Sequence, residues 1–281
     1  MSLDVLIPTC ARAGALAVTL MSLSAQTQKH FRIVISDQTQ YGDVCESREV
    51  LAVIRLLRAQ GRVVQVVKHL PKRGMAEQRQ FLLDQARAEY VLFVDDDVLL
   101  EPDLVTRLLA AIARSGAGFV GSAVIGLSYL NDVRPHEQAI EYWDGPVLAE
   151  RITPDDAAWQ RHRLHNAANL YHVQQRSQDD RLYKVAWVGG CVLYRTEALR
   201  ATGGFLFWRD LPEEHCGEDV LAQLRVMARF GGAGLLPSGA YHQELPTTVR
   251  SRKFDAVQML IGEDASRREE PADRAAKTSG G

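Results

Sequence analysis

The sequence has little net charge, which bears on its partners. Its 281 residues carry 33 Lys and Arg against 35 Asp and Glu, for a formal net charge of −2. A chain without a basic excess has no general electrostatic attraction to the phosphates of nucleic acid. We therefore expect no nucleic acid among its partners.

Cysteines are few and hydrophobic runs are short. The four cysteines are dispersed, with no CxxC pair, which favours reduced thiols. The longest weakly polar run, residues 116–130, has 15 residues and several glycines, too few to cross a bilayer. The start of the chain lacks the basic and apolar segments of a signal peptide. We expect a cytoplasmic protein without a transmembrane segment, and peripheral membrane contact stays open.

Several common catalytic motifs are missing. The sequence has no GxxxxGK[ST] phosphate loop, no GxGxxG after the first expected strand, no HExxH and no GxSxG. These absences remove most support for a P-loop kinase, an ordinary dehydrogenase, a zinc protease or a serine hydrolase.

Strand and helix patterns alternate through the first 115 residues. Short apolar runs alternate with segments of helical spacing, and the last of these helices is expected to begin at Pro102 and end near Gly116. Such alternation predicts an α/β fold with a Rossmann-like, mainly parallel central sheet flanked by helices. The expected strands are 3–9, 31–37, 62–70 and 90–95, and the helices are 15–26, 47–61, 75–88 and 102–116.

The second half of the chain is less regular. We assign no elements between residues 126 and 185. After this stretch we expect a strand at 183–195, a helix at 217–232, and a short strand and turn over 234–243. Residues 263–281 are almost without apolar side chains, which is typical of a disordered tail. We therefore expect one domain over residues 1–262.

Polar residues stand at the ends of the first expected strands. Pro8 and Thr9 end the first, Asp37 ends the second, and Asp95, Asp96 and Asp97 follow the fourth. Ligands of open parallel sheets bind outside the carboxyl ends of the strands. This edge is therefore the predicted site.

The three consecutive aspartates suggest a metal. Continued strand alternation would let Asp95 and Asp97 converge while Asp96 points elsewhere. Carboxylate oxygens suit Mg²⁺ or Mn²⁺, ions that keep positions open for substrate phosphates. His242, after a short apolar run, could add a nitrogen ligand. The alternatives are an acidic cap for the following helix and a structural histidine.

Two further groups have both a functional and a structural interpretation. Glu218 and Asp219 fall in the first turn of an expected helix, either as a general base with its neighbour or as capping residues. Gly74 and Arg79, with the nearby cations, could bind a diphosphate or form a solvated turn. The basic stretch 247–254 could be a lid over phosphate or a solvated loop.

Five segments together resemble the family 2 glycosyltransferases of the GT-A fold. They are "VLIPTCAR", "IVISDQT", "KRGMAEQRQFLLDQARAEYVLFVDDDV", "VGGCVLYRTEALRATGGF" and "GEDVLAQLRVMARFGG". Asp37 is followed by Gln38 and Thr39, where the family often has Asp-Gly-Ser at the strand that contacts the nucleobase. The absence of a QxxRW segment argues against a processive synthase.

The resemblance implies roles for particular residues. It divides the domain into a nucleotide-sugar half, residues 1–125, and an acceptor half, residues 126–262. Asp219 would be the catalytic base, next to Glu218, and Asp97, Asp95 and His242 would hold Mn²⁺ or Mg²⁺. The residues assigned to nucleotide-sugar binding are Pro8, Thr9, Arg12, Asp37, Gly74, Arg79, Asp95 and Asp96.

The implied activity is a metal-dependent, inverting transfer of one sugar, of hexosyltransferase type. The donor would be a nucleoside-diphosphate sugar, with a UDP-sugar favoured over a GDP-sugar. The acceptor would be a hydroxyl of a carbohydrate or lipid-linked molecule in bacterial polysaccharide, glycolipid or glycoconjugate synthesis. A sugar-phosphate nucleotidyltransferase and a non-catalytic nucleotide-sugar-binding module are the alternatives, and a homodimer stays open. Trp143, Trp159, Trp187 and Trp208 could stack on a sugar or belong to the core.

Overall fold

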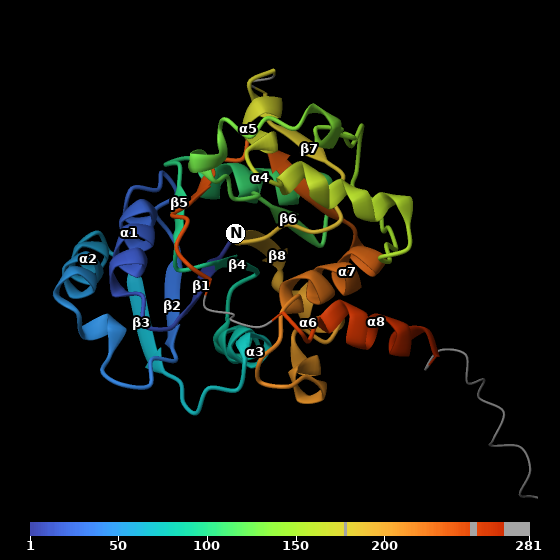
Figure 1. Ribbon diagram of the computed structural model, residues 1–281. Helices are drawn as coiled ribbons and strands as arrows, with labels where there is room; N and C mark the ends of the chain where they lie inside the picture. Colours follow the sequence, from blue (N-terminus) through green and yellow to red (C-terminus); the bar gives the residue numbers. More distant parts are fainter. Residues whose placement is uncertain (177–178, 248–251, 267–281) are drawn as a thin grey trace, which may run out of the picture.

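The computed structural model describes residues 1–176, 179–247 and 252–266 (Figure 1). In this part of the chain an eight-stranded sheet has the strand order β3-β2-β1-β4-β8-β6-β9-β7. The strands are β1 (Leu3–Thr9), β2 (Arg32–Asp37), β3 (Val63–Lys68), β4 (Tyr90–Val94), β6 (Phe119–Gly121), β7 (Arg181–Tyr183), β8 (Cys191–Arg195) and β9 (Gly232–Leu236).

Most neighbouring strands run in the same direction. β1 pairs in parallel with β2 and β4, β2 with β3, and β6 with β9. β8 runs antiparallel to both β4 and β6, and β7 runs antiparallel to β9. The predicted mainly parallel α/β sheet is confirmed.

Helices cover both faces of the sheet (Figure 1). One core cluster includes side chains of α1, α2 and α4, and the other includes side chains of α3, α6, α7 and α8. The helices are α1 (Ala13–Ser24), α2 (Arg48–Ala59), α3 (Met75–Gln85), α4 (Leu104–Ser115), α5 (Asn169–Gln174), α6 (Thr196–Ala201), α7 (Glu218–Phe230) and α8 (Ala256–Ser266).

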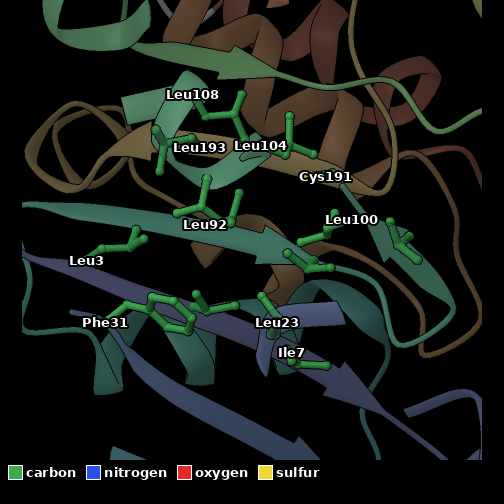
Figure 2. Close-up of a cluster of buried hydrophobic side chains, with 14 of the residues drawn as sticks. Leu3, Ile7, Leu23, Phe31, Leu92, Leu100, Leu104, Leu108, Cys191 and Leu193 are labelled. Atoms are coloured by element: carbon green, nitrogen blue, oxygen red, sulfur yellow. The ribbon is translucent and has the colours of Figure 1, made fainter. Parts of the chain in front are cut away.

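Side chains of the central strands alternate between the two faces of the sheet and so contribute to both hydrophobic clusters. On β4, Leu92 and Val94 face the first cluster, whereas Val91 and Phe93 face the second. Figure 2 shows Leu92 in the first cluster, among leucines from neighbouring strands and from α4. Because successive side chains of a strand point to opposite faces, a strand between two helical layers must be apolar throughout. This is why the short runs of the first half were recognisable as strands.

A second, two-stranded sheet lies at the edge where the site forms. It pairs β5 (Val98–Leu100) antiparallel with β10 (Ala240–His242), and His242 lies opposite Val98. The sequence analysis expected no strand at 98–100. Three residues are too few to show a period, and the partner strand is far away in sequence.

Several expected boundaries differ from those observed. The helix expected from Pro102 begins at Leu104, because the Leu104 amide still bonds to Glu101 in the preceding turn. The strand expected at 183–195 is divided between β7 and β8, and residues 184–190 form a loop. Helix α8 extends to Ser266, into the segment expected as a tail, and residues 267–281 lie outside the described residues.

Candidate active site

A cavity of about 630 Å³ lies at the carboxyl ends of β1 and β4. Its walls come from the ends of these strands, from α3, from the first turn of α7 and from the chain after β10. Many of the residues expected at the site meet here. Those lining the cavity are Pro8, Thr9, Arg12, Arg79, Asp95, Asp96, Asp97, Glu218, Asp219 and His242.

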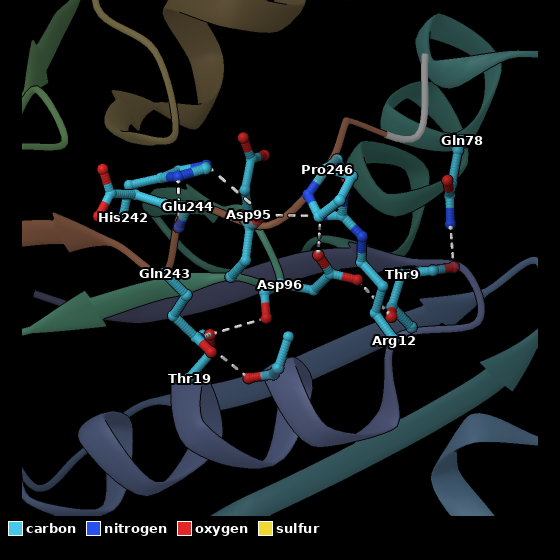
Figure 3. A network of polar contacts seen from close by, with 12 residues as sticks. Thr9, Arg12, Thr19, Gln78, Asp95, Asp96, His242, Gln243, Glu244 and Pro246 are labelled. Carbon is cyan, nitrogen blue, oxygen red and sulfur yellow. Dashed lines mark hydrogen bonds and ion pairs between the residues drawn. The ribbon is translucent and has the colours of Figure 1, made fainter. Parts of the chain in front are cut away.

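Asp96 is directed toward the end of β1, as Figure 3 shows. Its Oδ2 accepts a hydrogen bond from Thr9 Oγ1 at 2.7 Å, and its Oδ1 lies 3.3 Å from Nη1 of Arg12. Burial raises the pKa of Asp96 to about 6, although the Thr9 hydroxyl and the Arg12 cation oppose this rise. Asp96 thus ties the end of β1 to the turn after β4.

Asp97 shares Arg12 with Asp96. Arg12 Nη1 lies 2.6 Å from Asp97 Oδ2, and Arg12 also donates to the carbonyl of Pro246, in the segment after β10. Asp95 pairs with Arg79 instead, although both aspartates line the cavity, and their convergence on one ion stays a prediction. β4 ends at Val94 and the chain turns there, so the strand alternation does not continue through the aspartates.

His242 is brought to Asp97 by the ribbon of β5 and β10. Nε2 of His242 lies 3.5 Å from Oδ2 of Asp97, and the Gln243 amide donates to the Asp97 carbonyl at 2.9 Å. Nδ1 of His242 accepts from the Glu244 amide at 2.8 Å (Figure 3). In a neutral ring with this contact the proton is on Nε2, facing Asp97.

This donor set fits a divalent ion in part. The described residues contain no group of three or more His, Cys, Asp or Glu side chains arranged to hold a metal. Asp97 and His242 supply one carboxylate and one imidazole, and the Arg12 guanidinium on Asp97 marks a place that suits positive charge. Mg²⁺ uses one or two carboxylates and takes its other oxygens from phosphates and water. To bind an ion through Nε2, the neutral ring must carry its proton on Nδ1 instead, which gives up the hydrogen bond from the Glu244 amide.

Arg79 joins α3 to the other side of the cavity. Its Nε lies 3.1 Å from Oε1 of Glu218 and its Nη2 lies 3.0 Å from Oδ1 of Asp95. Burial disfavours the charge of Arg79, but Asp95, Glu218 and Asp219 outweigh it and raise the pKa of the guanidinium. A buried cation here holds together acidic groups that would otherwise repel one another.

Asp219 has the environment of a general base. Its Oδ1 accepts from the Val220 amide at 2.9 Å, within the first turn of α7. Burial, with a smaller effect from the charge of Glu218, raises the pKa of Asp219 to about 7, and Arg79 moderates the rise. A base whose pKa is close to the working pH can accept a proton and still be largely ionised.

A comparison with protein families shows which family the chain belongs to. A model of glycosyl transferase family 2 matches residues 4–202, more than half of the chain. The chain belongs to glycosyl transferase family 2. The resemblance drawn from the five segments is confirmed. A search of curated proteins gave no match.

Several solved structures are similar in fold to this family 2 member. TarS of S. aureus has a TM-score of 0.53 and 18% identity over 86% of this chain and 36% of TarS. A structure of TarS 1–349 with UDP-GlcNAc has a TM-score of 0.53 and 19% identity over 89% of this chain and 60% of that one. The mannosyltransferase PcManGT of Pyrobaculum calidifontis, in complex with GDP-Man and Mn²⁺, has a TM-score of 0.53 and 14% identity. This match covers 88% of this chain and 58% of PcManGT. The chain thus spans between about a third and three fifths of these proteins, which share the GT-A fold with it.

Asp37, assigned to base recognition, is outside the described lining of the cavity. Its carboxylate accepts from the amide and hydroxyl of Thr39 at 2.8 and 2.5 Å and pairs with Lys68 Nζ at 3.0 Å. Burial alone would raise the pKa of Asp37, but the Thr39 and Lys68 contacts lower it. In this structure Asp37 fixes the loop after β2, and its role toward a base stays a prediction.

Gly74, assigned to phosphate binding, is also outside the described lining of the cavity. It precedes α3 with φ +97, and a Cβ there would lie 2.5 Å from Cε1 of His215 and 2.7 Å from the Glu213 carbonyl. His215 Nε2 in turn accepts from the Ala76 amide at 3.1 Å. Glycine is required here because the loop before α7 packs directly on the start of α3.

The sequence analysis missed part of the cavity wall. Gln78 donates to the Ser36 carbonyl at 2.8 Å, and its place one residue before Arg79 on α3 was its only signal. Of the basic stretch 247–254, Arg252 lines the cavity, whereas Arg250 lies outside the described residues. The other lining residues without an assigned role are Cys10, Met75, Cys216, Gly217, Val220, Leu245, Thr247, Asp255 and Gln258. Trp187, for which sugar stacking and the core were the alternatives, also lines the cavity.

No helix in the described part of the chain combines the length and apolar character needed to cross a membrane.

Proposed function

We propose that this protein is a metal-dependent, inverting glycosyltransferase that moves one sugar from a nucleoside-diphosphate sugar to an acceptor hydroxyl. One observation carries the proposal: Asp219, a carboxylate with a raised pKa, lines the same cavity as Asp97 and His242. A glycosyl transfer needs a base for the acceptor and positive charge for the departing diphosphate. The cavity has groups suited to both.

The base is assigned to Asp219. Its carboxylate takes the proton of the acceptor hydroxyl while the hydroxyl oxygen bonds to the anomeric carbon. The bond from that carbon to the diphosphate oxygen breaks, and its electron pair leaves with the diphosphate. One attack from the side opposite the leaving group inverts the anomeric centre, through an oxocarbenium-like transition state. Glu218 is paired with Arg79 and is a positioning residue in this scheme.

The diphosphate is assigned to the other side of the cavity. Mn²⁺ or Mg²⁺, held by Asp97 and His242, would neutralise charge on the leaving diphosphate. The guanidinium of Arg12 pairs with Asp96 and Asp97 in this structure. If a metal ion took its place beside these carboxylates, the guanidinium could bind phosphate oxygens instead. Asp95 and Arg79, which pair with each other, also line the cavity.

The donor and acceptor classes are proposals as well. A UDP-sugar is favoured and a GDP-sugar is the second choice; the similar structures hold UDP-GlcNAc and GDP-Man respectively. The acceptor is a carbohydrate or lipid-linked hydroxyl in the synthesis of a bacterial polysaccharide, glycolipid or glycoconjugate. We place this reaction in the cytoplasm, where nucleotide sugars are available, and leave a homodimer and peripheral membrane contact as options for the protein.

The released product tests the proposal. The protein is incubated with Mn²⁺ and with UDP-glucose, UDP-GlcNAc or GDP-mannose, with and without methyl glycosides. We expect release of nucleoside diphosphate, in a reaction that Asp219→Asn slows at least a hundredfold while nucleotide binding is kept. Pyrophosphate formed from a sugar phosphate and a nucleoside triphosphate would instead indicate a nucleotidyltransferase. Nucleotide-sugar binding with no product would indicate a binding module.

A further inference from the structure

Trp187 is the tryptophan that lines the cavity among the described residues. It lies in the loop between β7 and β8, half-buried, and is the one Phe, Tyr or Trp among the described residues that line the cavity. Trp143 and Trp208, in contrast, pack against the two hydrophobic cores. An indole on the wall of a polar cavity offers an apolar surface at a fixed place.

The indole of Trp187 is held by aromatic neighbours. The His162 ring stacks on it, with centroids 4.8 Å apart and planes 13° from parallel. Trp159 lies 4.7 Å away at 46°, and its carbonyl bonds to Nδ1 of His162 at 2.7 Å. Aromatic contacts of this kind restrict the ring before any ligand arrives, which lowers the entropic cost of binding.

Gln223 fastens the Trp187 loop to the helix that carries the base. The amide of Val188 donates to Oε1 of Gln223 at 2.7 Å, and Nε2 of Gln223 donates to the Val188 carbonyl at 2.8 Å. Gln223 is fully buried and follows Asp219 by one turn of α7. Two hydrogen bonds therefore connect the residue after Trp187 to the helix that carries Asp219, on the side of the cavity that the proposed function gives to the acceptor.

We propose that Trp187 is the platform for a sugar ring of the acceptor, and that Gln223 is a positioning residue that aligns this platform with Asp219. This inference rests on the proposed function. A pyranose has one face of C–H groups, which packs well on an indole, and hydroxyls at its edge that can reach a base. The acceptor is accordingly a carbohydrate, and its reacting hydroxyl belongs to the ring that stacks on Trp187 or to the next one.

Saturation-transfer NMR with methyl glycosides tests the platform directly. The probes are the methyl α- and β-pyranosides of glucose, galactose, mannose and N-acetylglucosamine, each mixed with the full-length protein. We expect saturation of H1, H3 and H5 of at least one glycoside, reduced at least fivefold by Trp187→Leu and retained within twofold by Trp187→Phe. Trp208→Leu removes an indole outside the cavity lining and should leave the signal unchanged. Gln223→Leu should weaken the signal as Trp187→Leu does.

Two results would overturn the inference. One is that no glycoside binds, or that Trp187→Leu binds it as the wild type does. The other is that Trp187→Leu lowers the affinity for a nucleoside diphosphate, which would place the nucleotide on this ring. Thermal shifts with nucleoside diphosphates in the same samples report the proposed function separately. Glycoside binding at Trp187 without any nucleotide binding would contradict the donor site and leave the platform standing.

Discussion

The guanidinium of Arg79 lies 3.1 Å from Oε1 of Glu218, and this ion pair joins the middle of α3 to the first turn of α7. Arg79 also pairs with Asp95, so one buried cation bridges two carboxylates of the cavity wall. If Asp219 is the base, as proposed, its pKa depends on a residue that needs no contact with substrate.

Replacing Arg79 by Met should change both stability and the pH profile. Breaking a buried ion pair leaves Glu218 with an uncompensated charge, which typically costs about 3–5 kcal/mol. Loss of the cation also removes the influence that lowers the pKa of Asp219, so the midpoint of kcat against pH should move to higher pH.

The double variant Arg79→Met with Glu218→Gln is the control. It removes both charges of the pair and should recover part of the free energy of unfolding, as measured by urea denaturation. An unchanged pH midpoint in Arg79→Met would show that Arg79 has no electrostatic effect on the base.

The rate of transfer should rise with pH through about 7. Asp219 must be ionised to accept a proton, and its pKa lies at about 7 because of burial and the neighbouring Glu218. A pH series of kcat should show a limb with a slope of one below this value and a plateau above it. A rate independent of pH between 5 and 8 would contradict the assignment of Asp219 as base.

The same raised pKa predicts a cost in stability. Between the ordinary carboxyl pKa, near 3.8, and about 7, the folded state holds a proton that the unfolded state has lost. The contribution of Asp219 to the free energy of unfolding is thus fully present at low pH and is lost as the pH rises toward 7. Asp219→Asn should therefore stabilise the protein more at pH 8 than at pH 4. The difference should be on the order of 2 kcal/mol, measured by urea denaturation at both pH values.

His242 should affect the requirement for metal. His242→Ala should raise the Mn²⁺ concentration for half-maximal release of nucleoside diphosphate about tenfold, because it removes one proposed ligand. His242→Gln can still donate a hydrogen bond to Asp97 but is a poor ligand for Mn²⁺. If His242→Gln keeps the wild-type Mn²⁺ requirement, His242 orients Asp97 and does not bind the ion.

Gly74→Ala should destabilise the fold more than the same change at Gly61. Both glycines have positive φ, +97 and +83, but a Cβ at Gly74 would meet His215 and the Glu213 carbonyl, whereas a Cβ at Gly61 would meet nothing within 4 Å. We expect Gly61→Ala to cost about 1 kcal/mol for its backbone conformation alone. The cost for Gly74→Ala should exceed this by at least about 1 kcal/mol. Equal melting temperatures for the two variants would contradict the close packing between α3 and the loop before α7.

Most strands of the sheet could be predicted from local patterns of apolar residues. Apolar runs such as 90–95 could be identified because both faces of the central strands are buried, and the carboxyl edge then followed from the parallel arrangement. Asp97, Asp219 and His242 could be proposed for the site because each stands at the end of a strand or the start of a helix. Their mutual distances could not be proposed in this way.

The remaining features depend on contacts distant in sequence. β5 is three residues long and gains its identity from β10, so nothing local could predict that His242 lies beside Asp97. The pairing of Arg79 with Glu218 spans 139 positions. The direction of the Asp95 side chain depends on where β4 ends. The strand was expected over 90–95, but β4 ends at Val94 and the chain turns there. Periodicity does not predict the direction of an individual side chain at the end of a strand, because the regular alternation stops there.

The measurement that tests the donor site most directly is a thermal-shift series. UDP, GDP, CDP and dTDP are added to the wild type, to Asp97→Asn and to Asp219→Asn, each with Mn²⁺ and with EDTA. A ligand that binds the native state raises the melting temperature by linkage. We predict a Mn²⁺-dependent rise with UDP or GDP in the wild type and in Asp219→Asn, and its loss in Asp97→Asn. No rise with any nucleotide, or an equal rise in Asp97→Asn, would contradict the assignment of this cavity as a nucleotide-sugar site.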